Sequence, residues 1–195
     1  MIIGITGGYG SGKDSVADYL VNEKGLEKIS LSDFLRRECE EEGMKLTREN
    51  LIDKGNELRS KFGPWILGKM ARDSMDPSKD YVVVSIRNPY EVKELKKSKG
   101  FIMLYVTGPD DLRYKRVNSR RRAGERYSSI EEFLEMEARE MESSDADSQN
   151  ISKVADMAHI VLDNRYDTLE QLYEVVDRMY ADIKSGRLNR YICNS

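Results

Sequence analysis

The sequence predicts an α/β fold in which helices cover both faces of a five-stranded parallel sheet. Short apolar runs alternate with long stretches of helical period, which is the pattern of strand–helix units around such a sheet. Three of the runs are nearly all apolar, as strands buried on both faces are. With 195 residues, the chain has the length of one domain with a sizeable core, so we expect a single domain over residues 1–195.

Each expected strand is rich in β-branched or aromatic residues. In chain order, the strands are expected at residues 1–6, 28–31, 81–86, 101–106 and 159–162. Between the second and third strands, residues 33–75 show no strand pattern. This segment predicts an all-helical insert of two or three helices, with a turn at Gly63–Trp65.

The later helices begin at residues whose side chains can cap a helix. Asn88 precedes Pro89, which suits an N-cap followed by the first turn. Ser129 and Thr168 are each followed three residues later by Glu or Gln, the spacing of a capping box. The last helix carries an apolar stripe that should pack over the sheet, and the sequence beyond about residue 185 is typical of a loose tail.

Composition and charge exclude several classes of function. Charged residues make up 34% of the chain but nearly cancel, at a net charge of −3, so charge indicates no nucleic-acid or membrane partner. The apolar run Met1–Ile5 is too short for a signal segment, and we expect a cytoplasmic protein. Cys39 and Cys193 lie far apart, which fits a reducing compartment without a zinc site. The sequence contains one histidine, His159, so it offers almost nothing for mechanisms that need a pair of histidines or a Ser–His dyad, which removes most hydrolase mechanisms.

The segment Gly7–Lys13 matches the pattern G-x-x-x-x-G-K between a predicted strand and a predicted helix. Glycines let successive backbone N–H groups point into one concavity, the helix N-terminus adds partial positive charge, and Lys13 reaches the outer phosphates. The flanking strand and helix disfavour the alternative, a glycine-rich turn with an exposed lysine. We therefore predict a site for a nucleoside triphosphate. Its predicted residues are Gly7, Gly8, Tyr9, Gly10, Ser11, Gly12, Lys13, Asp14 and Ser15.

Asp14 stands where most such loops place the Ser or Thr that holds Mg²⁺. Ser15 does not replace that residue, since one position further along a helix turns a side chain by about 100°. Carboxylates are hard ligands suited to Mg²⁺, so we predict that Asp14 binds the metal and that nucleotide binding depends strongly on Mg²⁺. The alternative is an acidic residue that only favours the helix dipole.

Several segments resemble known P-loop kinases. The run Ile3–Lys13 resembles the opening of dephospho-CoA kinases, and Gly12–Asp18 is similar to phage-type deoxynucleoside monophosphate kinases. Ser32–Arg36, Ile86–Pro89 and Arg139–Met141 resemble a group of archaeal adenylate-kinase-related proteins and a domain fused to some deoxycytidylate deaminases. The likeness covers most of the chain. It implies the P-loop NTPase fold of nucleoside monophosphate kinases, a three-layer α/β/α arrangement with a helical acceptor-binding insert and an arginine-bearing lid.

The insert begins with Asp33 and Arg36, one helical turn apart at the carboxyl end of a strand, where α/β proteins place ligands. In the resembling kinases an acidic residue near Asp33 assists the attacking oxygen or the metal, and an arginine matching Arg36 holds the acceptor's phosphate. The resemblance thus implies a catalytic and metal-binding role for Asp33. The alternatives are that Asp33 only caps its helix and that Arg36 is a solvated surface cation. Arg59 is a further candidate acceptor contact or a surface charge.

Arg87 follows the third strand, where its guanidinium can be aimed at an acceptor phosphate. Its alternative is a capping surface cation. The resembling kinases often carry an acidic residue at or near Ser85, which this chain lacks. If Asp14 or Asp33 binds the metal, that loss is tolerable, because Mg²⁺ usually takes only one or two protein ligands.

Five arginines gather over residues 116–126, where the resembling kinases have their lid. We expect the lid at residues 119–128. A closing lid brings arginines to the migrating phosphoryl group and excludes water. The lid candidates are Arg126, predicted to be catalytic, together with Arg139 and Arg120. Alternatively, such a cluster is a solvated face or a nucleic-acid patch, which a net charge near zero disfavours.

We therefore expect a small-molecule kinase that uses ATP and Mg²⁺ to phosphorylate a small, nucleotide-like acceptor. The acceptor could be a deoxynucleoside monophosphate, a ribonucleoside monophosphate or dephospho-CoA, and the sequence does not separate them. A second hypothesis is a non-catalytic nucleotide sensor, which the departures at Asp14 and Ser85 motivate. A third, a nucleic-acid-dependent NTPase, rests only on the arginine cluster. The sequence indicates no oligomeric state.

Overall fold

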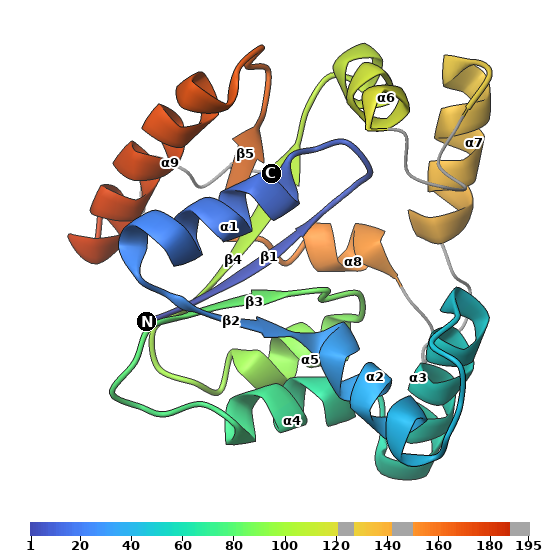
Figure 1. The fold of residues 1–195 in the computed structure, drawn as a ribbon. Coiled ribbons are helices and arrows are strands. Elements are labelled where there is room, and N and C mark those ends of the chain that lie inside the picture. Colours follow the sequence, from blue (N-terminus) through green and yellow to red (C-terminus); the bar gives the residue numbers. More distant parts are fainter. Residues whose placement is uncertain (121–126, 142–149, 188–195) are drawn as a thin grey trace.

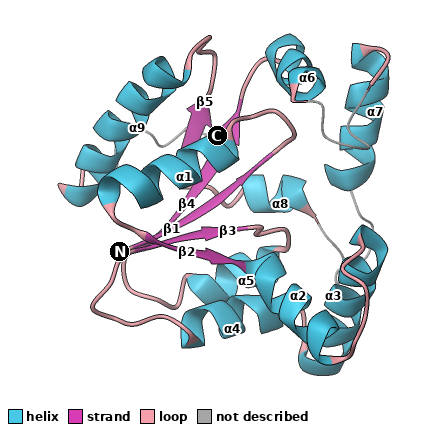
Figure 2. Cartoon of the chain, viewed as in Figure 1, coloured by secondary structure: helices cyan, strands magenta, loops and turns pink. Residues whose placement is uncertain are grey.

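Five parallel strands form the centre of the fold, and helices pack on both faces of the sheet (Figures 1 and 2). The computed structural model describes residues 1–120, 127–141 and 150–187, without the side chains of residues 139–141. The strands are β1 (Ile2–Gly7), β2 (Glu27–Ser30), β3 (Tyr81–Val84), β4 (Phe101–Thr107) and β5 (Ile160–Asp163). The helices are α1 (Lys13–Lys24), α2 (Leu31–Glu41), α3 (Arg48–Phe62), α4 (Ile66–Asp73), α5 (Pro89–Leu95), α6 (Asp110–Ser119), α7 (Ile130–Met141), α8 (Ile151–Ala155) and α9 (Leu169–Lys184). The expected α/β class and each expected strand are confirmed.

The strands lie in the order β2-β3-β1-β4-β5, and each neighbouring pair is parallel. The first strand, β1, therefore occupies the middle of the sheet, between β3 and β4. All six of its residues are buried, because helices cover both faces of the sheet at this position. Parallel strands end along one edge, so the loops that follow β1, β3 and β4 come together at the edge where α/β proteins bind ligands.

Two apolar clusters hold the helices against the sheet. On one face, Leu20 of α1 and Val176 of α9 pack with Ile5 of β1. On the other face, Leu67 of α4 and Val92 of α5 belong to a cluster that includes residues of α2, α3, β3 and β4. The result is the three-layer arrangement seen in Figure 1. Among the described helices, none is long and apolar enough to cross a lipid bilayer.

Side-chain caps fix most of the expected helix starts. The Asn88 side chain accepts a hydrogen bond from the Tyr90 N–H, and Glu91 completes a capping box. Thr168 accepts from the Gln171 N–H, but the Gln171 side chain accepts from the Asp167 N–H, so the expected box is only half formed there. At Ser129 the box is only half as expected: its hydroxyl accepts from the Glu132 N–H, but the Glu132 carboxylate accepts from Ser128 instead.

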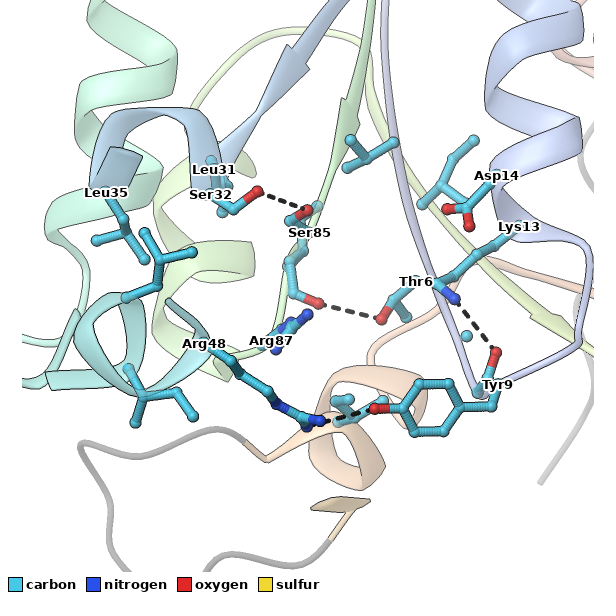
Figure 3. Close-up of a pocket in the computed structure, with 18 of the residues that line it drawn as sticks. Thr6, Tyr9, Lys13, Asp14, Leu31, Ser32, Leu35, Arg48, Ser85 and Arg87 are labelled. Carbon is cyan, nitrogen blue, oxygen red and sulfur yellow. Dashed lines mark hydrogen bonds between the residues drawn. The ribbon is translucent and has the colours of Figure 1, made fainter. Parts of the chain in front are cut away.

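The helical insert contains three helices, α2 to α4, and begins with Leu31 immediately after β2. The third strand ends at Val84, two residues earlier than expected, because Ser85 has a φ of 62°. This left-handed conformation is unfavourable for residues other than glycine, asparagine and aspartate. It ends the ladder and turns the Ser85 side chain toward the insert, as Figure 3 shows.

Candidate active site

A cavity of about 490 Å³ opens at the carboxyl ends of β1 and β3, between the glycine-rich loop and the helical insert (Figure 3). Lys13 and Asp14 lie on one side of it, and Ser32, Ser85 and Arg87 lie on the other. The first group comes from the loop and the start of α1, whereas the second comes from α2 and the end of β3. Two chemically different ends therefore share one cavity.

The glycine-rich loop adopts a conformation that needs its glycines. Gly10 and Gly12 have φ values of 68° and 91°, in the region that side chains disfavour. A Cβ at Gly7 would lie 2.2 Å from the carbonyl oxygen of Val106, and one at Gly10 would lie 2.3 Å from that of Arg113. The loop is thus packed closely against the ends of β4 and α6.

Polar side chains from outside the loop hold it in place. The Asn164 side chain donates to the Ser11 carbonyl at 2.8 Å. Arg116 of α6 donates to the Gly10 carbonyl at 3.4 Å and to the Tyr166 carbonyl at 2.6 Å. The sequence pattern alone did not single out either residue as a supporter of the loop. The contacts with Ser11 and Gly10 use loop carbonyls, so they do not occupy the backbone N–H groups with which the loop can bind an anion.

Lys13 begins α1, and its ammonium donates to the Gly8 carbonyl at 3.3 Å. Asp14 is exposed in the first turn of the same helix and lines the cavity. Ser15 is absent from the residues that line the cavity, as the 100° turn per residue implies. The carboxylate of Asp14 fits Mg²⁺, which in phosphate-transfer sites binds one or two carboxylates together with substrate phosphates.

We expect Asp14→Asn to weaken binding of the Mg²⁺–triphosphate complex by roughly tenfold, because a charged metal ligand is replaced by a neutral one. In chelator, the same substitution should leave binding unchanged or improve it, since a negative charge beside the phosphates is removed. Calorimetric titration under both conditions measures the two effects. Asp18→Asn, in the same helix and paired with Lys28, serves as the control. Parent-like binding by Asp14→Asn in both conditions would limit Asp14 to a helix-dipole role.

The other end of the cavity carries three arginines. Arg48 at the start of α3, Arg59 in the same helix and Arg87 after β3 all line it. Arg59 is 4% exposed and forms a 3.2 Å ion pair with Glu91, which is 1% exposed. Its Nε is buried without a hydrogen-bond partner in the described part of the chain. A buried donor without a partner is costly, which is consistent with a site that a ligand completes.

The electrostatics of this end reflect the clustered positive charge. Burial lowers the pKa of Arg87. The neighbouring guanidinium groups of Arg48 and Arg59 lower it further, whereas Tyr9 and the Glu91 carboxylate raise it. Burial also raises the pKa of the Glu91 carboxyl, which the charge of Arg59 and the backbone N–H groups of Arg87 and Asn88 oppose. A guanidinium stays protonated under all ordinary conditions. An anion bound here would therefore relieve repulsion between like charges.

Three serine hydroxyls meet beside these arginines. Ser30 lies 2.9 Å from Ser32 and 3.1 Å from Ser85, oxygen to oxygen, at the ends of β2 and β3. Arg36 donates to the Ser32 hydroxyl at 2.9 Å. The resembling kinases often carry an acidic residue near Ser85, whereas this chain has a cluster of neutral hydroxyls there. The cluster can donate and accept hydrogen bonds without repelling an anion.

Asp33 and Arg36 form an ion pair one helical turn apart at the start of α2. Arg36 lines the cavity, but Asp33 is not among the lining residues and its side chain is 61% exposed. The structure thus brings Arg36 toward the site and leaves Asp33 on the outer side of it. This placement favours pairing with Arg36 over the catalytic and metal-binding role that the resemblance implies. Asp33 does not cap the helix, since the N-cap residue of α2 is Ser30 and no side chain caps it.

Of the three lid candidates, the structure places one at the cavity and does not describe the side chains of the other two. Arg120 lines the cavity at the end of α6. Arg126 lies outside the described residues, and Arg139 belongs to α7 with a side chain outside the description. The predicted segment 119–128 is described only at its two ends. The roles of Arg126 and Arg139 stay predictions.

Sequence reasoning missed two charged residues of the cavity, Arg48 and Glu137. Arg48 follows Thr47, whose side chain caps α3, and that cap was the one available sign of its position. Glu137 lies in an acidic stretch of α7 that looks like a solvated helix face. Neither residue belongs to a local sequence motif. Only tertiary packing brings them to the loop, so the sequence alone does not reveal them.

The fold and the cavity together define a P-loop protein of kinase-like α/β architecture. A family model described as "AAA domain" matches residues 3–140, and the chain belongs to this family and to the UPF0200 proteins. The UPF0200 protein of Aeropyrum pernix is 31% identical over 137 residues, covering 70% of this chain and 72% of that protein. The UPF0200/UPF0201 protein of Archaeoglobus fulgidus is 29% identical over 183 residues, and this chain spans 54% of its length. Shikimate kinase from Acinetobacter baumannii shares the fold, with a TM-score of 0.56, 14% identity and 93% of each chain covered.

Proposed function

We propose that this protein transfers the terminal phosphoryl group of ATP, bound as its Mg²⁺ complex at the glycine-rich loop, to a small acceptor that carries a phosphate. One observation carries the proposal: a single cavity has a P-loop at one end and three arginines, Arg48, Arg59 and Arg87, at the other. Each end has the chemistry that binds phosphate. Two phosphates held in one cavity are in position to react with each other.

The residues of the two ends have complementary tasks. Loop N–H groups and Lys13 hold the β- and γ-phosphates, and Asp14 is the residue that would hold Mg²⁺, whose charge offsets that of the phosphates. Arg59 and Arg87 hold the acceptor phosphate, with Arg48 and Arg36 beside it. We include residues 33–75 in the acceptor-binding insert of a single domain, and residues 119–128 in a lid that carries Arg120 and Arg126, with Arg139 following it.

The acceptor end favours a phosphate oxygen over an alcohol as the nucleophile. An alcohol must lose a proton, which a carboxylate usually takes. Among the described residues that line the cavity, the carboxylates are Asp14 and Glu137, and both lie at the loop end. A phosphate monoester has a second pKa of about 6 and is already an anion at neutral pH. Its oxygen attacks the γ-phosphorus, the bond to the bridging oxygen breaks, and the nucleoside diphosphate leaves with the bonding electrons.

A nucleoside monophosphate, deoxy or ribo, therefore fits better than dephospho-CoA, whose phosphorylated group is an alcohol. Aliphatic side chains line the same cavity and suit the apolar body of a base. They are Leu31, Leu35, Leu51, Ile52, Leu67, Ile86 and Ile151. The insert supplies most of these residues, so it determines which acceptor is accepted.

The experiment that tests this function is a triphosphate-consumption assay over a panel of ribo- and deoxynucleoside monophosphates, with nucleosides and dephospho-CoA as alcohol acceptors. We expect consumption that depends on one or a few monophosphates and that stops when Mg²⁺ is chelated. Triphosphate consumption only with the alcohol acceptors, and not with any monophosphate, would overturn the assignment of the acceptor. Tight triphosphate binding with no consumption for any acceptor would favour the sensor, which the hydroxyl cluster at Ser85 also motivates.

A further inference from the structure

Tyr9 at the tip of the loop contacts three other parts of the molecule. Its backbone N–H donates to the Glu137 carboxylate of α7 at 3.0 Å. Its carbonyl accepts from Arg113 of α6 at 3.2 Å, and its hydroxyl accepts from Arg48 at 3.4 Å (Figure 3 shows the last contact). Tyr9 thus connects the loop to the insert and to both helices that flank the expected lid.

Buried side chains and close packing hold the Glu137 carboxylate against the loop. Glu137 is 8% exposed and forms an ion pair with Arg113, which is 7% exposed. Arg113 is in turn held by Asp110 and by the Gly108 carbonyl. A Cβ at Gly8 would lie 2.2 Å from the Glu137 carboxylate oxygen, so only glycine admits the carboxylate this close to the loop. The carboxylate is therefore fixed against the loop and does not simply lie near it.

A carboxylate at this place resembles a bound anion. It accepts a hydrogen bond from the tip of a loop whose N–H groups are arranged for phosphates, and it lines the same cavity. A terminal phosphate entering the loop would face the negative charge of Glu137 within a few ångströms. Like charges this close repel in a partly buried site, so removing the charge of Glu137 should strengthen triphosphate binding.

We propose that Glu137 is a determinant of triphosphate affinity: its carboxylate holds the loop tip, and the terminal phosphate of a bound triphosphate displaces it. The proposal rests on the proposed triphosphate site. Displacement frees α7 from Tyr9, whereas the contacts of Phe133 with Tyr114 and Tyr127 still hold α7 beside α6. Occupation of the loop is thereby coupled to the helix that follows the expected lid.

Glu137→Gln tests this directly, because glutamine keeps the size and the hydrogen-bond acceptor of Glu137 but removes its charge. We expect the variant to bind the Mg²⁺–triphosphate complex about tenfold more tightly than the parent, with a smaller gain for the diphosphate, which lacks the terminal phosphate. Calorimetric titration measures both. Glu135→Gln, an exposed position of the same helix, is the matched control and should bind like the parent.

Unchanged or weaker triphosphate binding by Glu137→Gln, in a variant that unfolds cooperatively like the parent, would contradict the proposal. An equal gain for diphosphate and triphosphate would contradict displacement by the terminal phosphate. Glu137→Met, a second neutral replacement of similar length, is measured alongside and should show the same gain. If the parent itself binds no triphosphate, the proposed function fails; if the parent binds and only the expected gain is missing, this inference alone fails.

Discussion

Lys13→Ala is expected to reduce triphosphate turnover by roughly a hundredfold or more, the largest effect of any single substitution in this protein. Lys13 supplies a full positive charge within the loop itself, and its ammonium already lies 3.3 Å from the Gly8 carbonyl at the edge of the cavity. Without it, the charge that develops around the γ-phosphate loses its nearest cationic partner. Steady-state kinetics together with calorimetric binding of the Mg²⁺–triphosphate complex measure the loss.

Lys115→Ala is the matched control, because Lys115 is exposed on α6 and pairs only loosely with Asp111 at 3.8 Å. We expect this variant to behave like the parent. Parent-like turnover by Lys13→Ala would contradict the assignment of the glycine-rich loop as the triphosphate site. Thermal unfolding of both variants should match that of the parent, since neither lysine is buried.

Arg87→Ala should lower kcat/KM for the acceptor by roughly a hundredfold while the affinity for triphosphate changes little. A charge-assisted hydrogen bond to phosphate contributes about 1.5–3 kcal/mol, and Arg87 lines the acceptor end beside Arg48 and Arg59. Acceptor kinetics at saturating triphosphate measure the loss. Arg87→Lys should recover only part of it, because a lysine keeps the charge but lacks the planar fork.

Arg36→Ala is the informative comparison for Arg87. Arg36 is 45% exposed and already donates to Asp33 and Ser32, so fewer of its N–H groups are available to an acceptor phosphate. We expect its loss to raise the acceptor KM by only a few-fold. A fall confined to triphosphate affinity in Arg87→Ala would move Arg87 from the acceptor end to the donor end. If Arg36→Ala impaired acceptor kinetics as much as Arg87→Ala, the ion pair between Arg36 and Asp33 would have to open when the acceptor binds.

The fold was predictable because its signals are local. Apolar runs such as Tyr81–Val84 mark strands buried on both faces, and the cap at Asn88 marks a helix start. The loop was predictable for the same reason, since its glycines and Lys13 stand at fixed spacing between a strand and a helix. One local error, the length of the third strand, arose because an apolar pattern does not reveal the left-handed conformation of Ser85.

The acceptor end was only partly predictable, since it depends on contacts between distant segments. The sequence predicts Arg59 as either a surface charge or an acceptor contact, yet Arg59 is buried against Glu91, 32 residues away. Glu137 reaches Tyr9 across 128 residues. Composition assigns such charged residues to the surface, where most of them lie. The burial of these residues becomes evident only when the insert and α7 pack around the cavity.

The most direct test of the central claim is phosphorus NMR of the parent protein with Mg²⁺–ATP and the best monophosphate of the panel. We predict that the γ-phosphate signal falls while β-phosphate signals of two diphosphates, one from the donor and one from the acceptor, rise in equal amounts. Release of inorganic phosphate without a phosphorylated acceptor, or a bound ATP that stays intact with every monophosphate, would contradict transfer between the two ends of the cavity.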